Sequence, residues 1–538
     1  MITELKNIIQ GEVSDSSVDL EKYSRDASIF EVKPQLVVYP KDAEDLKKLV
    51  SWAATEKSSH QNLSLTARSA GTDMSGGPLN DSIIIDFTRH FSRVLEVGDG
   101  YAVAEPGVYY RDFEKATLKK GLLMPAYPAS REICTIGGMV ANNSGGEKSL
   151  SYGKTDRYVQ NLEVILSDGN SCVLEPLALA GLEEKKRLET FEGKVYRETH
   201  DLIKANYDLI QRAKPDVSKN SAGYALWNVE HDGMFDLTKI FVGSQGTLGL
   251  ITKIKLGLIK PKKYSKLLVI FLNDLKPLGD LVNEVMKFKP ESFESYDDKT
   301  LRLALKFFPR LKGYFWKFLP EFWMLLTGGI PKLVLLAEIT DDNESEVDRI
   351  LKDLEQAVHS RFKVRTHITS SQAEAQKYWA VRRESFNLLR NHVGNEHTAP
   401  FIDDVIVHVD QLPEFLPRLN DLISQYKGLT YTIAGHAGDA NFHIIPLMDF
   451  RKEENRRAIP ELSEKVYDLV ISLKGSITAE HNDGLIRTPY LEKMYGREVV
   501  ELFKKTKEIF DPLNIFNPGK KVMVPKEQAY IKEHILQS

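Results

Sequence analysis

Three glycine-rich segments constrain the fold of this chain, because each adjoins a β-rich run and keeps the backbone free of large side chains. They span residues 66–78, 136–146 and 241–252. Consecutive small residues let backbone N–H groups converge on phosphate oxygens, so the segments predict a long, phosphate-bearing cofactor. Neither of the first two is a P-loop or the Gly-x-Gly-x-x-Gly dinucleotide motif, which disfavours ATP and NAD. Glycine-rich loops are also common as plain turns, so these segments alone leave both interpretations open.

The first quarter of the chain alternates short strands with a helix. Residues 35–39 and 82–86 have the composition of strands, and residues 43–55 have helical periodicity with an acidic first turn. These patterns predict a βαβ-like unit. Between residues 264 and 430, apolar strands such as 267–271 alternate with charged helical stretches, which is typical of an α+β domain with an antiparallel sheet.

Helical periodicity returns near the C-terminal end, at residues 458–473 and 490–510. The Lys260-Pro261-Lys262-Lys263 run separates the glycine-rich part from the segment that follows it. We therefore expect a domain boundary at this run.

The composition excludes several classes of protein. At 538 residues and 61.0 kDa the chain is long enough for two or three domains, and its net charge of -4 gives no reason to expect nucleic acid as a partner. Its two cysteines, Cys134 and Cys172, are too few for a disulfide framework or a Cys₄ iron–sulfur cluster, and they favour a reducing cytoplasm. We see no signal peptide and no transmembrane run. The aromatic and basic stretch at residues 314–323 suits a membrane surface, although packing against its own domain is favoured.

Two motifs near the C-terminal end supply three histidines together with carboxylates. Residues 436–443 read His-Ala-Gly-Asp-Ala-Asn-Phe-His, and residues 478–484 read Thr-Ala-Glu-His-Asn-Asp-Gly. Two neutral imidazoles and one carboxylate can hold a divalent cation with positions left open for substrate, while His481 would serve as a base. His436 and His443 would lie on opposite faces of one continuous strand, so the Gly-Asp between them would have to bulge or turn the chain.

Taken together, these motifs resemble a known family. The glycine segments, with Tyr152-Gly153, look like the FAD-binding domain of the vanillyl-alcohol oxidase superfamily. The two histidine motifs and the Asp-Pro-x-Asn-Ile-x-Asn-Pro-Gly-Lys motif ending at Lys520 narrow the resemblance to the D-lactate, glycolate and D-2-hydroxyglutarate dehydrogenase branch. The resemblance implies an α+β fold: a two-subdomain PCMH-type FAD-binding domain at residues 1–262, an antiparallel-sheet cap domain at 263–475, and a helical segment at 476–538 that completes the flavin site.

The resemblance also implies FAD stretched between the two subdomains, with its pyrophosphate on the first glycine segment. Some relatives tether FAD through a histidine in that segment, but residues 68–77 contain none. We therefore predict FAD bound without a covalent link. The positions that match the family's flavin contacts are Arg68, Ser69, Ala70, Gly71, Thr72, Ser75, Gly76, Gly77, Pro128, Gly137, Gly138, Asn142, Ser144, Gly145, Gly146, Gly153, Gly246, Ile251 and Asn517.

The family carries a divalent metal, zinc or manganese, and a histidine base beside it. A Lewis acid that grips the hydroxyl and carboxylate of a 2-hydroxy acid lowers the alcohol pKa, and an imidazole then takes the proton. Two positions depart from the family pattern, which has glycine at each. Ala440 is tolerable only if its φ is not positive. Asn482 is easier to accept, because asparagine is the non-glycine residue best suited to a left-handed backbone. The residues so assigned are His436, His443 and Glu480 as ligands, His481 as base, and Asn441 and Asp439 as their support.

A bidentate contact to the substrate carboxylate is expected from Arg382, in the segment that resembles the family's Trp-x-x-Arg. Arg383 and Arg487 are alternatives, and a solvated helix face is an equal interpretation for Arg383.

The resemblance implies oxidation of a D-2-hydroxy acid, with D-lactate ahead of glycolate and D-2-hydroxyglutarate. The alternatives are an oxygen-reducing oxidase and a non-catalytic flavin subunit, which would be expected to lose the metal histidines. Longer relatives are fused to a Cys-rich iron–sulfur module. With two cysteines in the chain, electrons are expected to leave through a separate iron–sulfur subunit, a quinone or cytochrome, or oxygen. We expect a cytoplasmic protein, with peripheral contact at the inner face of the membrane as the alternative.

Overall fold

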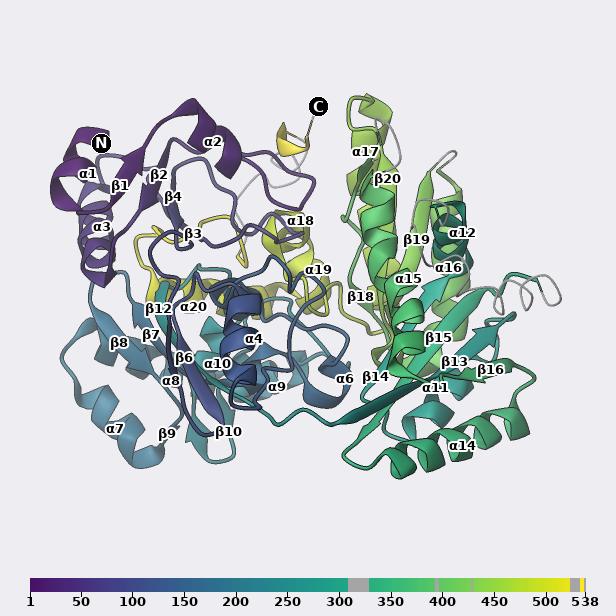
Figure 1. Cartoon of the computed structure of the whole chain (residues 1–538). Helices are drawn as coiled ribbons and strands as arrows, with labels where there is room; N and C mark the ends of the chain where they lie inside the picture. The colour runs from purple at the N-terminus through teal and green to yellow at the C-terminus, as the bar shows by residue number, and fades with distance from the viewer. Residues whose placement is uncertain (308–328, 392–395, 427–428, 523–532, 537–538) are drawn as a thin grey trace.

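The computed structural model describes residues 1–307, 329–391, 396–426, 429–522 and 533–536. Figure 1 shows two lobes side by side. The N-terminal lobe runs from α1 to β12 and is completed by α18 to α20, and the cap lobe runs from β13 to α17. The stretch at residues 314–323, with its predicted membrane contact, lies outside the described residues.

The first half of the N-terminal lobe is a four-stranded sheet in the order β1-β2-β4-β3. Strands β2, β3 and β4 are parallel and β1 is antiparallel to β2. Both faces of β2 and β4 are buried, which explains their continuous apolar sequences. The strands and helix predicted from this region are confirmed. The elements are α1 (Ile2–Ile8), β1 (Glu12–Ser14), α2 (Ser17–Tyr23), β2 (Leu36–Tyr39), α3 (Ala43–Glu56), β3 (Leu65–Arg68) and β4 (Ile83–Asp86).

The second half is an antiparallel five-stranded sheet in the order β5-β6-β12-β7-β8, flanked by helices and by a small three-stranded sheet, β10-β11-β9. Strand β12 lies at its centre and alternates buried and more exposed residues, as a strand with one covered face does. The strands are β5 (Val94–Val97), β6 (Tyr101–Ala104), β7 (Val159–Ile165), β8 (Ser171–Leu174), β9 (Leu177–Ala178), β10 (Glu230–His231), β11 (Met234–Phe235) and β12 (Leu250–Gly257). The helices are α4 (Tyr110–Leu118), α5 (Ile136–Asn142), α6 (Ser149–Tyr152), α7 (Leu179–Arg187), α8 (Phe191–Ala205), α9 (Tyr207–Ala213) and α10 (Thr238–Phe241).

The cap lobe is an antiparallel sheet in the order β16-β13-β15-β14-β19-β20-β17, with β18 also paired to β20. The predicted antiparallel α+β domain is therefore confirmed. Helices α11, α14, α16 and α17 share one hydrophobic cluster with this sheet, and α15 packs on a second cluster with β13, β15 and β19. The strands are β13 (Tyr264–Leu272), β14 (Ser292–Asp297), β15 (Leu333–Asp341), β16 (Arg365–Ile368), β17 (His397–Thr398), β18 (Val405–Ile406), β19 (Thr430–His436) and β20 (Asn441–Met448). The helices are α11 (Leu278–Met286), α12 (Asp298–Phe307), α14 (Glu344–Arg361), α15 (Gln372–Asn391), α16 (Leu412–Ser424) and α17 (Glu453–Ser472).

The C-terminal helices return to the N-terminal lobe, where they appear yellow among the blue elements of Figure 1. They are α18 (Gly484–Arg487), α19 (Leu491–Tyr495) and α20 (Arg497–Phe510). Leu491, Phe503 and Phe510 are buried in the hydrophobic cluster of the second subdomain. Each such side chain contributes roughly 1.5–3 kcal/mol of burial free energy, so the return is firmly anchored.

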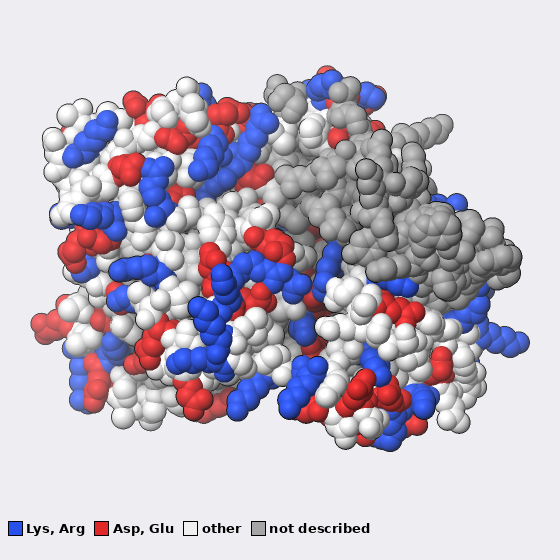
Figure 2. Space-filling model, in the orientation of Figure 1, with Lys and Arg blue, Asp and Glu red and all other residues white. Residues whose placement is uncertain are grey.

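On the face that Figure 2 shows, Lys and Arg are interspersed with Asp and Glu over the described residues, so no large patch there has a single charge. Cys134 and Cys172 are both buried and free. None of the helices in the described ranges combines the length and the apolar character needed to cross a bilayer.

Candidate functional site

A cavity of about 640 Å³ is lined by the three glycine-rich segments of the N-terminal lobe and by β14, α15, β19 and β20 of the cap lobe. Its glycine-rich wall offers bare backbone, as a phosphate-bearing cofactor requires. The side-chain oxygen Oδ1 of Asn142 is buried on this wall without a hydrogen-bond partner among the described residues. These features fit FAD. The predicted flavin contacts that line the cavity are Arg68, Ser69, Ala70, Gly71, Thr72, Gly77, Pro128, Gly137, Gly138, Asn142, Ser144, Gly145, Gly146, Gly246 and Ile251.

Four predicted flavin contacts, Ser75, Gly76, Gly153 and Asn517, do not line the cavity. Asn517 instead donates to the carbonyls of Gly77 (2.9 Å) and Gln245 (2.7 Å), and so ties the first glycine segment to the third. The contact of these four residues with a cofactor stays a prediction.

Arg68 braces the first glycine segment. Its guanidinium donates to the carbonyls of Tyr23 (3.0 Å) and Arg25 (2.5 Å) and lies against Gly71, where an added Cβ would fall 2.4 Å from Nη2. Gly71 also has φ +69. Glycine suits this turn, because it adopts a positive φ freely and leaves room for the Arg68 guanidinium.

A tight hairpin brings His436 and His443 together. β19 ends at His436, residues 437–439 form a 3₁₀ turn, and β20 begins at Asn441, with His436 opposite Asn441 and Ala434 opposite His443. The predicted turn at the Gly-Asp pair is confirmed. The two imidazole rings lie 5.3 Å apart, nearly perpendicular to each other.

Glu480 lies against both histidines. Its Oε1 lies 3.0 Å from His436 Nε2 and 3.6 Å from His443 Nε2. Ligand atoms bound to a tetrahedral zinc ion at about 2.0–2.1 Å lie roughly 3.3 Å apart, and the two measured spacings bracket this value. The residues present therefore fit a divalent metal at this position.

The protonation tendencies of the two histidines differ. Burial and the neighbouring His481 lower the pKa of His443 well below its usual value, so its imidazole is neutral, as a metal ligand must be. Burial would also lower the pKa of His436, but the Glu294 and Glu480 carboxylates outweigh it and raise that pKa to about 9. A protonated His436 would donate from Nε2 to Glu480 Oε1, 3.0 Å away.

A second, overlapping set consists of Asp404, His443, Glu480 and His481, whose ligand atoms lie within 4.8 Å of one another. Both oxygens of the Asp404 carboxylate already accept hydrogen bonds. The side-chain donors are Asn441 (3.1 Å) and Thr478 (2.6 Å), and the backbone donors are the N–H groups of Glu480 (2.9 Å) and His481 (2.7 Å). Its role is to hold the 478–481 segment against the hairpin. Asn441, predicted to support the ligands, thus anchors this carboxylate from outside the cavity lining.

The second oxygen of Glu480 faces Lys219, which sequence analysis did not single out. Lys219 Nζ lies 3.4 Å from Glu480 Oε2 and 2.9 Å from Asp439 Oδ2, and its side chain is 3% exposed. Burial would lower the pKa of Lys219, but the Asp439 and Glu480 carboxylates raise it, so the lysine is a cation.

Glu294 on β14 links His436 to the predicted carboxylate clamp. Its Oε1 lies 2.6 Å from His436 Nδ1, and its Oε2 lies 3.2 Å from the guanidinium of Arg382. A carboxylate behind a histidine ligand fixes the ring and its tautomer. Arg383 also lines the cavity and pairs through two nitrogens with Glu147, at 3.0 and 2.6 Å.

His481 is oriented by Asp403, whose Oδ1 lies 2.8 Å from His481 Nδ1. His481 lines the cavity and its ring stacks on that of His443, 4.9 Å away. Burial would lower the pKa of His481, but Asp403 and Asp404 raise it to about 10. Arg487, an alternative in the sequence analysis for the contact with the substrate carboxylate, is fully buried outside the cavity lining. It donates to Asp403 Oδ1 (3.0 Å) and so supports Asp403.

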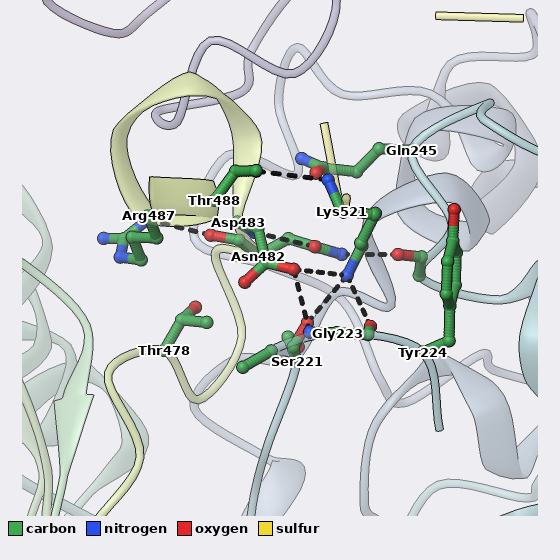
Figure 3. A network of polar contacts seen from close by, with 12 residues as sticks. Ser221, Gly223, Tyr224, Gln245, Thr478, Asn482, Asp483, Arg487, Thr488 and Lys521 are labelled. Carbon is green, nitrogen blue, oxygen red and sulfur yellow. Dashed lines mark hydrogen bonds and ion pairs between the residues drawn. The ribbon is translucent and has the colours of Figure 1, made fainter. Parts of the chain in front are cut away.

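A buried polar network fixes the segment after His481 (Figure 3). Asn482 has φ +70, which confirms that asparagine adopts the left-handed conformation here. Its side chain donates to the carbonyls of Asn142 and Gly243. Lys521 reaches into the network from the C-terminal side, 3.0 Å from Asp483 Oδ2. The segment after His481 is therefore tied to the second and third glycine segments and to the stretch that follows α20.

Comparison with known families agrees with this geometry. Residues 34–175 match the FAD binding domain, and residues 261–521 match the C-terminal domain of the FAD linked oxidases. The chain belongs to the FAD-linked oxidases. Among solved structures, the 4-ethylphenol oxidase from Gulosibacter chungangensis shares this fold, with a TM-score of 0.70 over 98% of this chain and 97% of that one at 15% identity.

Relatives of this FAD-linked oxidase include a D-2-hydroxyglutarate dehydrogenase from Pseudomonas putida, 28% identical over 95% of this chain and 50% of that protein. The glycolate oxidase subunit GlcD of Bacillus subtilis is 27% identical over 94% and 93% of the two chains. The D-lactate dehydrogenase of Archaeoglobus fulgidus is 26% identical over 90% and 91%. The chain spans about half the length of the D-2-hydroxyglutarate dehydrogenases from Pseudomonas putida, Escherichia coli and Haemophilus influenzae.

Four charged residues of the site, Lys219, Glu294, Asp403 and Asp404, were missed by sequence analysis. The adjacent Asp403 and Asp404 stand between apolar residues on both sides, and Glu294 interrupts a strand whose residues are all buried. Charged residues in apolar surroundings are almost always paired, so buried and paired carboxylates could have been predicted at these three positions. Lys219 lies in a polar loop and gave no such signal.

Proposed function

We propose that this FAD-linked oxidase oxidises a D-2-hydroxy acid, D-lactate first, to the 2-oxo acid, using FAD bound without a covalent link and a divalent metal, zinc or manganese. The observation that carries the proposal is that His436 Nε2 and His443 Nε2 both lie close to Glu480 Oε1, in the cavity that the glycine segments line. When bound, FAD would accept the hydride from Cα and the metal would act as a Lewis acid on the substrate's oxygens.

The chain's own residues would bind the substrate and move its proton. Arg382 offers a guanidinium to the substrate carboxylate, with Glu294 holding it in place. His481 takes the hydroxyl proton as the hydride leaves Cα, so the substrate loses two electrons and two hydrogens in all. Next to a divalent cation His481 would hold its own proton less tightly, because like charges repel, which favours the neutral form that a base needs. Asp403 keeps Nδ1 of this imidazole engaged and leaves Nε2 to act.

A substrate with a small apolar side chain is supported by the cap sheet beside the metal ligands. Alternate residues of a strand share one face, so Thr432 and Ala434 line the cavity together with His436 on β19, and Ile445 lines it with His443 on β20. This uncharged strip suits the methyl group of lactate. The D-lactate dehydrogenase among the relatives supports the same choice, and glycolate and D-2-hydroxyglutarate are the alternatives.

Electrons would leave the reduced flavin through a separate acceptor, which we propose to be an iron–sulfur subunit, a quinone or a cytochrome. One relative is named as a subunit of glycolate oxidase, which supports a multi-subunit arrangement. The chain's two buried cysteines cannot supply a Cys₄ cluster.

Anaerobic mixing of the FAD-loaded protein with D- and L-lactate, glycolate and D-2-hydroxyglutarate tests the proposal through bleaching of the flavin absorbance. D-lactate should bleach it fastest, and removal of the metal with a chelator should abolish bleaching. No bleaching by any of these acids with metal present would refute the dehydrogenase, and bleaching that survives the chelator would refute the metal role. Reoxidation by air at the rate of turnover would favour the oxidase, and flavin that stays on acid-precipitated protein would contradict non-covalent binding.

A further inference from the structure

Lys219 joins three separate parts of the chain at the proposed metal ligand Glu480. The lysine lies in the loop after α9, Asp439 lies in the hairpin turn between β19 and β20, and Glu480 lies in the C-terminal segment. Its ammonium stands 2.9 Å from Asp439 Oδ2 and 3.4 Å from Glu480 Oε2. The proposed reaction gives this buried cation no role.

The carboxylate of Glu480 divides its two oxygens between different neighbours. Oε1 faces His436 and His443, whereas Oε2 faces Lys219 and the backbone of Gly145, where an added Cβ would fall 2.7 Å from it. An ammonium on one oxygen leaves the other as the atom that can face a cation.

The position of Glu480 does not depend on Lys219. Its backbone N–H donates to Asp404 Oδ2 (2.9 Å), and its carbonyl accepts from Asn142 Nδ2 (3.0 Å). The contact with His436 Nε2 holds the carboxylate from the other side. Loss of the lysine would therefore remove a positive charge and leave the ligand close to its place.

We infer that Lys219 is a positioning residue that limits Glu480 to one metal-facing oxygen and, as a fixed cation, keeps the bound metal electron-poor. The inference rests on the proposed function. A positive charge beside a ligand carboxylate repels a divalent cation and lowers the charge that the carboxylate donates. Lys219 thus lowers the metal affinity of the site and raises the Lewis acidity of the bound metal. Without Lys219 the site should bind metal more tightly and catalyse more slowly.

Lys154 provides a matched control in the same region. It is a buried lysine whose ammonium donates to the Asn220 carbonyl (2.8 Å), Ser221 Oγ (2.7 Å) and the Ala479 carbonyl (2.8 Å), all of them uncharged. Lys219→Met and Lys154→Met therefore both remove a buried lysine near the 478–481 segment, but only the first removes the partner of Glu480 Oε2.

The test titrates Zn²⁺ into FAD-loaded, metal-stripped protein against a fluorescent zinc chelator, and measures flavin reduction by D-lactate separately at saturating Zn²⁺. Lys219→Met should bind Zn²⁺ about tenfold more tightly or better, by removal of the like charge, yet reduce its flavin at least about tenfold more slowly. Lys154→Met should keep the wild-type Zn²⁺ affinity within about threefold, and Lys219→Arg, which keeps the charge, should do the same.

Unchanged or weaker Zn²⁺ binding by Lys219→Met would overturn the inference and leave the lysine a structural role. If Lys219→Met does not fold, Lys219→Gln replaces it under the same expectation. Wild-type protein that binds no Zn²⁺ would overturn the proposed metal site together with this inference, whereas wild-type binding without tightening in the variant overturns the inference alone.

Discussion

Asp403→Asn separates the orientation of His481 from the stability of the fold. Asp403 is fully buried, and its Oδ1 lies 2.8 Å from His481 Nδ1 and 3.0 Å from Arg487 Nη2. The substitution keeps the shape but removes the charge that holds the imidazole, and the amide can present its NH₂ group to Nδ1 and so invert the tautomer. A positioned base contributes about 10² to 10⁴-fold to a rate, so flavin reduction by saturating substrate should slow by roughly that range.

The same change leaves the Arg487 cation without its carboxylate in a fully buried site. Removing one partner of a buried ion pair costs about 3–5 kcal/mol. Arg487 retains hydrogen bonds to the carbonyls of Asp403 (2.7 Å) and Asn482 (2.9 Å), which places the expected loss near the lower value. Thermal unfolding of the FAD-loaded variant measures this loss.

Asp511→Asn is the control for the loss of stability. Asp511 is fully buried, pairs with Lys507 and accepts the backbone N–H groups of Ile515 and Phe516, away from the cavity. It should lower the unfolding temperature in a similar way while stopped-flow flavin reduction stays at the wild-type rate. If Asp403→Asn reduced its flavin within about threefold of wild type, His481 would not depend on Asp403, and the role of Asp403 in orienting the base would be refuted.

Three further predictions address the ligand set, the hairpin turn and the dependence of stability on pH. Glu294→Gln weakens the hold on His436 Nδ1 and should lower Zn²⁺ affinity about 10 to 100-fold in the chelator competition, and an unchanged affinity would contradict this. Ala440→Gly relieves the strain of a left-handed backbone but loses a buried methyl worth about 0.8 kcal/mol. The free energy of unfolding measured in urea should therefore change by less than about 1 kcal/mol. Ala440→Val, with a branched side chain at a positive φ, should lower it clearly. Burial raises the pKa of Asp297 from 3.8 to about 6, so this group adds stability at low pH that is lost as the pH rises through about 6. Asp297→Asn should remove this dependence from the profile of unfolding free energy against pH. Parallel profiles for the variant and the wild type would refute the prediction.

The strands of the fold were predictable where local composition decides them. Residues 35–39 and 82–86 read as strands because both faces of β2 and β4 are buried and call for continuous apolar sequence. The order of the cap sheet was not predictable, since β14 pairs with β19 across about 140 residues of chain. Pairing at such separation depends on packing that no local pattern encodes.

The site divides in the same way. The hairpin between His436 and His443 is local and was predicted from the turn residues, but the contacts of Glu480 with His436, of Glu294 with His436 and of Lys219 with Glu480 span 44, 142 and 261 residues. Only the resemblance to a family supplied the first of these. The second depends on the pairing of β14 with β19 inside the cap sheet, and the third on how the N-terminal lobe meets the C-terminal segment. A lysine in a polar loop looks the same in sequence whether it is solvated or buried.

Ala440 shows how these long-range contacts change a local expectation. The sequence predicted that alanine would be tolerated here only if its φ were not positive, and the structure gives φ +54. Ala440 alone joins the 3₁₀ turn at residues 437–439 to β20, whose first residue, Asn441, pairs with His436, so Ala440 closes the hairpin in this left-handed conformation. A left-handed alanine costs roughly 1–2 kcal/mol, which its buried methyl and the ion pair of Lys219 with the preceding Asp439 help to offset. The turn between the two proposed metal ligands thus takes its conformation from the pairing of the two strands around it, which the residue type at position 440 does not reveal.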